Sequence, residues 1–196
     1  QLVAIELPHP SQRILAEHWQ AVGMAATRSV VIEFDDSPGL AIGSPGQYLS
    51  RPGFWQGGAG IAACWYGAAE ALADYLREHC RKPRRDPHAD AHLGAVDAAL
   101  YGARAALREC ATWIDLHPQD DASFEVRRTR AQVEQAVEQV IQHVGRALGA
   151  TPFCCSSHFA RLSADLPVYI RQSHAERDLA ELGRQLTGLP AGAWQL

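Results

Sequence analysis

The sequence predicts a mainly α-helical protein, an antiparallel up-down four-helix bundle preceded by a short β-rich segment. Three observations carry this expectation. Apolar residues recur at steps of three and four over long stretches, Pro and Gly punctuate these stretches at short intervals, and runs rich in Val, Ile and Leu are confined to the beginning of the chain. Because short loops join consecutive long helices, we expect neighbouring helices to run antiparallel.

The β-rich segment comes first. Residues 2–7 (LVAIEL) and 30–34 (VVIEF) have strand composition, and the turn sequence DDSPG at 35–39 closes the second run. Residues 11–19 between them fit a short helix or an irregular connection. Because two strands do not make a stable sheet alone, the segment is either the end of a larger sheet or a hairpin lying on the helices.

The first long helix is predicted within residues 51–76, RPGFWQGGAGIAACWYGAAEALADYL. A core-facing stripe at helical spacing comprises Ile61, Trp65, Ala68, Leu72 and Leu76. A second set of small residues comprises Gly57, Gly60, Ala63 and Gly67. Glycine is costly inside a helix, so these small residues indicate close approach by another backbone or by a flat ligand. Close packing alone would account for them.

Two further helices have clear boundaries. One opens at Asp86-Pro87, a capping residue followed by a first-turn proline, and stops at Pro118. Its apolar seam is Leu93, Val96, Leu100, Ala103, Leu107, Cys110 and Ile114. The next opens at residues 120–121 and ends at Gly149, a left-handed terminator. Its apolar face is Val133, Val137, Val140, Ile141, Val144 and Leu148.

The fourth helical segment is predicted to be broken. Residues 156–164 form one piece, Asp165 and Pro167 restart the helix, and it continues to about Gly188. We therefore expect the break near residues 165–167.

Composition limits the functional classes. A net charge of -4 in 196 residues leaves no electrostatic footprint for nucleic acid, and no apolar run suffices to span a membrane. The five cysteines fit no zinc or redox spacing, which favours reduced thiols in a cytoplasmic protein. His88 and His92 are four residues apart but lack a Glu-x-x-His partner motif, so no metal site is expected. Because the chain begins at Gln1, we expect a processed product or part of a longer polypeptide.

A basic cluster lies at the end of the first long helix. It consists of Arg77, Arg81, Lys82, Arg84 and Arg85. The plainer interpretation is favourable interaction with the helix dipole in a solvated loop, and the functional one is contact with a phosphate.

Three stretches resemble the C-terminal part of the acyl-CoA dehydrogenase family. They are VGMAATRSVVIEFDD (22–36), IGSPGQYLSRPGFWQGGAG (42–60) and RALGATPFCCSSHFARLSADLPVYIRQSHAERDL (146–179). The resemblance implies that residues 1–45 are the end of a β domain and that residues 46–196 are the C-terminal four-helix bundle. It implies a flavoenzyme that uses FAD for α,β-dehydrogenation of an acyl thioester, with acyl-CoA as substrate and a homodimer or homotetramer as assembly. A chain lacking the preceding domains would be inactive alone.

The resemblance also implies positions for site residues. Arg51 matches the family's arginine at the head of the bundle, which borders the active site. Arg81 and His92 match an Arg and a Gln that reach the FAD of a neighbouring subunit, although Arg84 and Arg85 replace an aromatic-Gly pair in between. Gly149 and Ala150 fall on a Gly-Gly turn that approaches the cofactor, with the second glycine lost.

The catalytic base departs from the family pattern. The position that supplies a Glu in many members is Ser173 here, and serine has no useful basicity near neutral pH. If residues 173–177 are helical, Ser173, Glu176 and Arg177 share a face, which ranks Glu176 first and His174 second as the base. Two alternatives stay open: a flavin-dependent monooxygenase of the same fold, which needs no carboxylate base, and a non-catalytic helical module for oligomerisation or partner binding.

Overall fold

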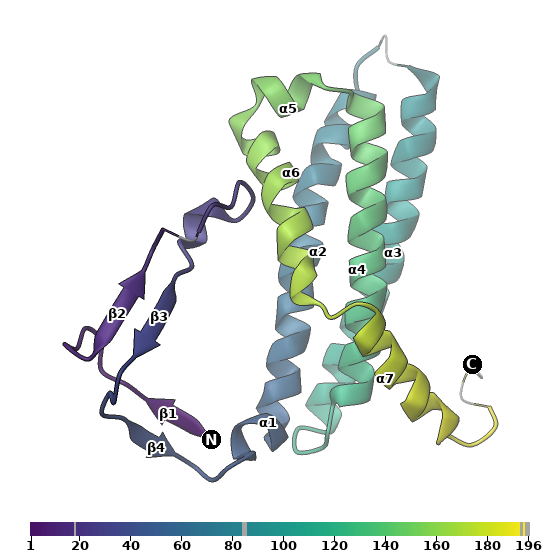
Figure 1. Cartoon of the computed structure of the whole chain (residues 1–196). Helices are drawn as coiled ribbons and strands as arrows, with labels where there is room; N and C mark the ends of the chain where they lie inside the picture. The colour runs from purple at the N-terminus through teal and green to yellow at the C-terminus, as the bar shows by residue number, and fades with distance from the viewer. Residues whose placement is uncertain (18, 84–85, 193, 195–196) are drawn as a thin grey trace.

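The structure, a computed structural model, describes residues 1–17, 19–83, 86–192 and 194. It is mainly helical, as predicted. Three long helices, α2 (Pro52–Cys80), α3 (Pro87–Leu116) and α4 (Ser123–Leu148), pack against one another. In Figure 1 the chain runs up α2, down α3 and up α4, and then descends through α6 (Ser157–Tyr169).

Local chemistry sets the helix boundaries. The Asp86 carboxylate accepts a hydrogen bond from the His88 amide (2.9 Å) at the start of α3, and Pro87 occupies the first turn as predicted. Helix α4 begins two residues later than expected, because the Asp121 carboxylate accepts from the amide and the hydroxyl of Ser123, each at 2.9 Å. Gly149 ends α4 with φ 63° and ψ −162°, a conformation that is essentially restricted to glycine and lies outside the left-handed helical region.

The core lies between α2, α3, α4 and α6. The predicted stripes of α3 and α4 are buried or half-buried against it. On α2 the buried stripe is shifted from the predicted one and consists of Ala62, Trp65, Ala69, Leu72, Ala73, Leu76 and Cys80. Ile61, at 36% exposure, lies at the edge of this stripe. The small-residue set does not mediate close packing within this chain, because a Cβ added at Gly57, Gly60 or Gly67 would have no atom within 4 Å.

The break in the last helical segment lies elsewhere than predicted. Helix α6 runs through Pro167, follows α5 (Thr151–Cys155) and continues into the 3₁₀ turn η2 (Ile170–Gln172). The chain breaks only at residues 173–175, before α7 (Glu176–Thr187). Packing explains the difference, because α6 is held along α2 by apolar side chains that include Phe159, Leu166 and Ile170. Tertiary packing therefore outweighs the loss of one helical hydrogen bond at the proline.

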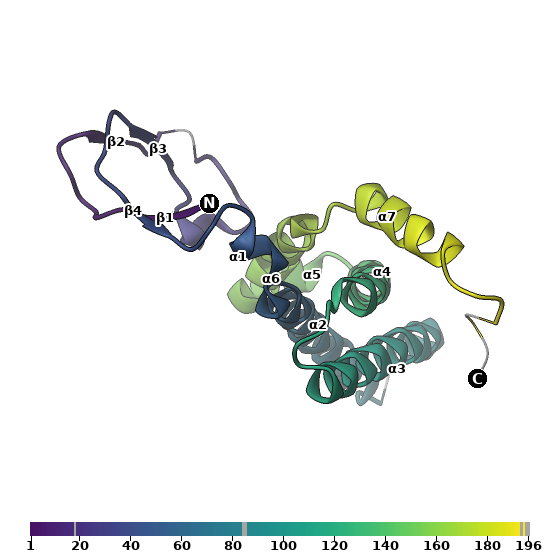
Figure 2. The same ribbon diagram turned by 90° about the horizontal axis from the view of Figure 1, so that it is seen from below.

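Residues 1–45 form two antiparallel pairs of short strands. Strand β1 (Leu2–Ala4) pairs with β4 (Leu40–Ile42), and β2 (Gln12–Leu15) pairs with β3 (Val31–Phe34). Residues 12–15, expected to be helical or irregular, are thus a strand. Figures 1 and 2 show these strands projecting to one side of the helices, with α7 on the other side.

This N-terminal segment buries little of its own apolar surface. Exposed side chains include Leu2, Val3, Ile14, Phe34 and Leu40, at 41–71% exposure. The segment contacts α6 through the turn that precedes the short 3₁₀ helix η1 (Ala25–Thr27). There the Met24 amide donates to Asp165 Oδ1 at 2.5 Å, and a Cβ added at Gly23 would lie 2.0 Å from the Ala164 carbonyl oxygen, so only glycine fits. A short helix, α1 (Gln47–Ser50), then leads into α2.

Among the residues that the structure describes, none of the helices combines the length and the hydropathy that crossing a bilayer requires.

Candidate functional site

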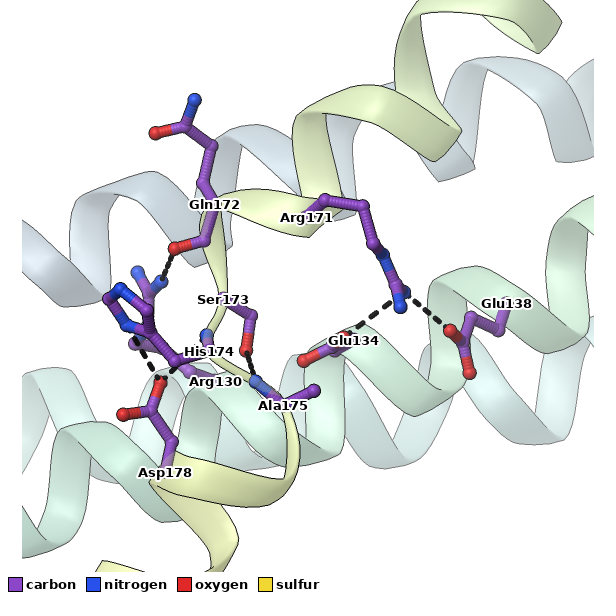
Figure 3. Close-up of polar contacts among 9 residues, drawn as sticks. All are labelled: Arg130, Glu134, Glu138, Arg171, Gln172, Ser173, His174, Ala175 and Asp178. Carbon is purple, nitrogen blue, oxygen red and sulfur yellow. Dashed lines mark hydrogen bonds and ion pairs between the residues drawn. The ribbon is translucent and has the colours of Figure 1, made fainter.

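A short loop between η2 and α7 holds the position where the resemblance places a catalytic carboxylate. Figure 3 shows this loop: the Ala175 amide donates to Ser173 Oγ (3.2 Å), and the His174 amide donates to Asp178 Oδ2 (3.1 Å). Ala175 has φ 42° and ψ −114°, an unusual backbone conformation for a residue other than glycine. The loop is therefore fixed by its own hydrogen bonds, and the Ser173 hydroxyl is used in that fixation.

The expected shared helical face of residues 173–177 is wrong, because Ser173 is extended and α7 begins only at Glu176. The loop directs neighbouring residues to different surfaces. Ser173 and Glu176 line a groove between α4 and α7, of about 560 Å³. His174 and Arg177 line a larger one, of about 960 Å³, between the beginning of α2 and α7.

We call the larger hollow the α2/α7 groove and the smaller one the α4/α7 groove. The α2/α7 groove is defined by Tyr48, Arg51, Trp55, Arg127, His174 and Arg177. It brings together two of the three predicted catalytic residues, Arg51 and His174. The third, Glu176, lines only the α4/α7 groove and is exposed. His174 therefore shares a groove with Arg51, and Glu176 does not.

His174 is accessible within this groove. Its side chain is 67% exposed, and its ring nitrogen Nδ1 lies 3.7 Å from Asp178 Oδ2. The Asp178 carboxylate thus contacts both the amide and the ring of His174 (Figure 3). The His174 imidazole therefore lies at the surface of the α2/α7 groove, within reach of a ligand there.

Aromatic rings and arginines form the rest of the α2/α7 groove. The Arg51 guanidinium carbon lies 4.3 Å from the centroid of the Tyr48 ring, and that of Arg127 lies 4.2 Å from the Trp55 ring. Phe54 joins the two aromatic residues by edge-to-face contacts, with centroid distances of 5.8 Å to Tyr48 and 5.6 Å to Trp55. These pairs hold the guanidinium groups in fixed orientations.

Arg130 connects the elements on which the groove is built. Its Nη1 donates to the Gly58 carbonyl (2.9 Å) on α2 and its Nη2 to the Gln172 carbonyl (3.4 Å) in η2. Its guanidinium carbon also lies 4.6 Å from the Trp65 ring centroid. Burial lowers the pKa of Arg130, and the nearby carboxylate of Asp178 opposes this effect. Arg130 is a structural link between α2, α4 and the loop.

Ion-paired side chains line part of the α4/α7 groove. Arg171 lies between two carboxylates of α4, 3.1 Å from Glu134 and 2.5 Å from Glu138 (Figure 3). These contacts fix the chain just before the 173–175 loop. The Arg171 side chain is paired with these two carboxylates, whereas Glu176 has no side-chain partner among the residues that the structure describes.

The residues predicted to contact a cofactor lie at the opposite end of the helices. Arg81 follows the last turn of α2 and pairs with Glu78 (2.9 Å). His92, in the second turn of α3, makes a 2.9 Å Nδ1–Nδ1 contact with His143 of α4. Gly149 and Ala150 join α4 to α5 at this end.

Two of the expected cations, Arg84 and Arg85, lie outside the described residues. Those that are described favour the plainer interpretation, since Arg77 pairs with Asp74 at 2.8 Å and Arg81 pairs with Glu78. In the described ranges, no three His, Cys, Asp or Glu side chains gather as a metal site.

The predicted catalytic residues and the predicted cofactor-binding residues lie at opposite ends of α2, far apart. Arg51 precedes α2 and Arg81 follows it, and a helix of 29 residues is about 43 Å long. One dinucleotide cofactor does not span this distance. If both groups contact flavin, they contact different flavin molecules.

Sequence reasoning missed Arg127, Tyr48 and Arg177 as site residues. One signal for these residues was present in the sequence. Two arginines, Arg127 and Arg130, lie between Val126 and Val133 and interrupt an otherwise apolar helical face. The contribution of Tyr48 has no local signal, since it depends on how α1 folds back against the start of α2.

No protein-family model matches the sequence, and no curated protein sequence matches it. Solved structures do match. KijD3, in complex with FMN and a dTDP-linked amino keto sugar, has a TM-score of 0.78 and 19% identity over 95% of this chain and 51% of its own. An acyl-CoA dehydrogenase-like protein from Mycobacterium smegmatis has a TM-score of 0.77 and 17% identity over 93% of this chain and 51% of its own. Dibenzothiophene monooxygenase from Paenibacillus sp. A11-2 has a TM-score of 0.72 and 18% identity over 90% of this chain and 53% of its own.

These matches extend over nearly all of the chain, while the chain spans about half the length of each matching structure. Their sequence identities are below 25%, so the likeness concerns the fold. The chain therefore has the fold of acyl-CoA dehydrogenase-like proteins.

Proposed function

We propose that this chain is part of a flavin-dependent oxidoreductase whose reaction takes place at the α2/α7 groove. The observation that carries the proposal is the convergence of Arg51 and His174 on one groove at the loop 173–175. These residues lie 123 positions apart by number (174 − 51) and come together only through the fold. The flavin ligand of KijD3 and the redox names of the other two matching structures support the same class of chemistry.

The residues at both ends of the helices are of the kinds that a flavin requires. At the groove, Tyr48, Trp55 and the guanidinium of Arg51 offer flat surfaces for a planar ring. At the other end, Arg81 is a suitable partner for a phosphate, and a Cβ added at Gly149 would meet no atom within 4 Å, so that turn is open to close approach. A bound flavin supplies oxidation of the substrate or, when reduced, activation of dioxygen. We retain FAD as the proposed flavin.

Among the reactions of this fold, we favour monooxygenation, because the carboxylates in the α2/α7 groove are already committed. Asp178 accepts from the His174 amide, and Glu181 accepts hydrogen bonds from Arg184, which lower the pKa of Glu181. A carboxylate held in its ionised form by an arginine is a weak base. The groove offers His174 for proton transfer, and among its described residues both carboxylates, Asp178 and Glu181, already have hydrogen-bond partners.

The second candidate is the α,β-dehydrogenation of an acyl thioester such as acyl-CoA, using FAD. His174 favours it, because its exposed imidazole lies in the groove beside Asp178, and imidazole is the side chain that most often acts as a general base. In this reaction His174 would take the α proton while Arg51 and the aromatic residues hold the substrate. Glu176 remains a possible base only if α7 turns toward the α2/α7 groove.

The separation of the two ends supports assembly as a homodimer or homotetramer. Arg81, His92, Gly149 and Ala150 would serve a flavin bound mainly by a neighbouring subunit, while Arg51 faces the flavin of its own subunit. Residues 1–45 would belong to a β domain, and residues 46–196 would form the helical domain. The exposed apolar residues of β1–β4 support this division, because they leave a surface for further strands.

The full-length protein, loaded with FAD, separates the two reactions. Under anaerobic conditions, a panel of acyl-CoA thioesters should leave the flavin absorbance unchanged if the protein is a monooxygenase. Reduced flavin, ¹⁸O₂ and substrate candidates should then give a product that carries one ¹⁸O atom. Bleaching by any thioester would favour the dehydrogenase, and failure to retain any flavin would contradict both.

A further inference from the structure

We propose that the α2/α7 groove recognises an oxyanion on a ligand that also carries a flat ring, with Arg51 and Arg127 as the anion-binding residues. This inference deepens the proposed function, on which it rests for the role of the groove, because it gives the chemical class of the compound that enters. The shared chemistry is that of an aromatic phosphate, sulfonate or carboxylate. Its test uses binding alone, so its failure is distinguishable from failure of the flavin proposal.

The guanidinium groups of Arg51 and Arg127 are positioned by aromatic rings and make few hydrogen bonds or ion pairs within the described residues. Arg51 forms no side-chain hydrogen bond or ion pair with any residue that the structure describes, apart from its contact with the Tyr48 ring. Arg127 makes one long hydrogen bond, 3.4 Å to Gln185 Oε1, and its Nε is buried without a partner. A buried donor without an acceptor is costly in a protein. Arg127 lines the groove, so its guanidinium group lies beside any ligand there, although the Nε itself is buried.

The arginines of the α2/α7 groove outnumber its acidic residues, Asp178 and Glu181. Arg177 on α7 also lacks a side-chain partner within the described ranges and lines the same groove. Its two acidic residues, Asp178 and Glu181, are engaged by His174 and Arg184 respectively. Among the described residues, Arg51 and Arg177 therefore have no ion-pair partner, and Arg127 has only its long bond to Gln185, in a protein whose net charge is -4. Cations concentrated in a hollow of an otherwise acidic protein attract and orient an anion.

The shape of the groove adds a requirement for a ring. The rings of Tyr48, Phe54 and Trp55 form a chain of edge-to-face contacts along one wall. The volume of about 960 Å³ lies within the range of small-molecule sites. An arginine stacked on an aromatic face presents its N–H edge outward, which is the geometry for bidentate binding of an oxyanion. A ligand with adjacent flat and anionic parts uses both features.

Isothermal titration calorimetry of the chain with phenyl phosphate, benzenesulfonate and benzoate tests this site. We expect the anions to bind and the neutral analogue benzyl alcohol to bind at least tenfold more weakly. Arg51→Gln and Arg127→Gln should each weaken binding of the preferred anion by roughly tenfold to a hundredfold, because each removes charged hydrogen bonds. Arg51→Lys should recover only part of the loss, since lysine keeps the charge without the planar fork.

Arg104→Gln is the matched control, because Arg104 also lies over a tyrosine ring (Tyr101, 5.5 Å) but outside the groove. It should leave the affinity unchanged. Thermal unfolding of each variant checks that binding is lost without loss of the fold, and Arg51 is exposed. Equal binding of benzyl alcohol and the anions, or unchanged affinity in folded Arg51→Gln and Arg127→Gln, would overturn the proposal.

Competition with FMN distinguishes two sources of the oxyanion. Displacement of phenyl phosphate by FMN would assign the oxyanion to a flavin phosphate. Simultaneous binding would assign it to the substrate.

Discussion

The two ends of α2 differ in how their charged groups are satisfied. At its beginning, Arg51 and Arg177 have no ion-pair partner among the described residues, and the Nε of Arg127 is buried without an acceptor. At its end, Arg81 pairs with Glu78, and His92 pairs with His143. Among the described residues, cations at the beginning of α2 are left for a ligand, whereas Arg81 and His92 at its end already have partners in this chain.

This difference indicates which end binds a ligand directly. A buried donor without an acceptor, such as the Arg127 Nε, reduces stability, and retention of such a group is typical of functional sites. The pairs at the far end must rearrange before they contact a phosphate. This difference supports the proposal that the reaction takes place at the beginning of α2, with the far end in a supporting role across a subunit boundary.

The largest expected effect concerns proton transfer in the α2/α7 groove. His174→Gln in the flavin-loaded, full-length protein should lower kcat by about a hundredfold, the range typical of a lost general acid or base. Glu176→Gln is the matched control, because its side chain lines the other groove and kcat should change by less than about twofold. Steady-state kinetics of both variants measures the contrast. The reverse ranking would restore Glu176 as the base.

At the far end, we expect the glycine at 149 to be required by the backbone. Gly149→Ala should reduce the free energy of unfolding by about 1–3 kcal/mol, because φ 63° with ψ −162° strains any residue with a Cβ. Gly145→Ala serves as control, since an added Cβ would meet Phe153 at an ordinary 3.6 Å in a helical position. Denaturant unfolding of both should show destabilisation only at 149. Equal stability of both variants would exclude a backbone requirement.

At the α2/α7 groove, replacing an alanine by glycine in the loop 173–175 should relieve backbone strain. Ala175→Gly should raise the free energy of unfolding by about 1 kcal/mol, because glycine adopts φ 42° with ψ −114° at lower cost. Ala180→Gly, within α7, should instead lower it by roughly 0.5–1 kcal/mol. If Ala175→Gly were as destabilising as Ala180→Gly, the strained conformation of the loop would be incorrect.

The smallest effect is a pH dependence at the edge of the groove. Hydrogen bonds from Arg184 lower the pKa of Glu181 in the folded state. A carboxyl group with a lowered folded pKa stabilises the fold above its unfolded pKa, and this stabilisation disappears as the pH falls through the folded pKa. Glu181→Gln should therefore be less stable than the parent near pH 7 and equal to it in strong acid. A stability difference that does not change with pH would contradict this assignment.

The fold was largely predictable because local signals marked it. Asp86-Pro87 and Gly149 set helix ends by hydrogen bonding and backbone conformation, which sequence reveals directly. The break at 173–175 was not predictable from the sequence, because Pro167 is a stronger local signal for a helix end than Ser173. Only the packing of α6 on α2 shows that the helix continues through Pro167.

The site was predictable only in part. Resemblance pointed to Arg51 and His174, which do share a groove, and to Glu176, which faces another. The rest of the groove joins the turn at Tyr48 to Arg127 on α4 and Arg177 on α7. Residues so distant in sequence are brought together by tertiary packing, which periodicity does not encode.

The absorption spectrum of the flavin tests most directly whether the groove is the reaction site. The full-length protein loaded with FAD would be titrated with the tightest-binding aromatic anion, while calorimetry monitors binding. We expect the flavin bands to shift in proportion to occupancy in the parent and in Arg104→Gln, and to remain unchanged over the same ligand range in Arg51→Gln. Saturation of the groove by the anion with an unaltered flavin spectrum in the parent would contradict the placement of the reaction at the beginning of α2.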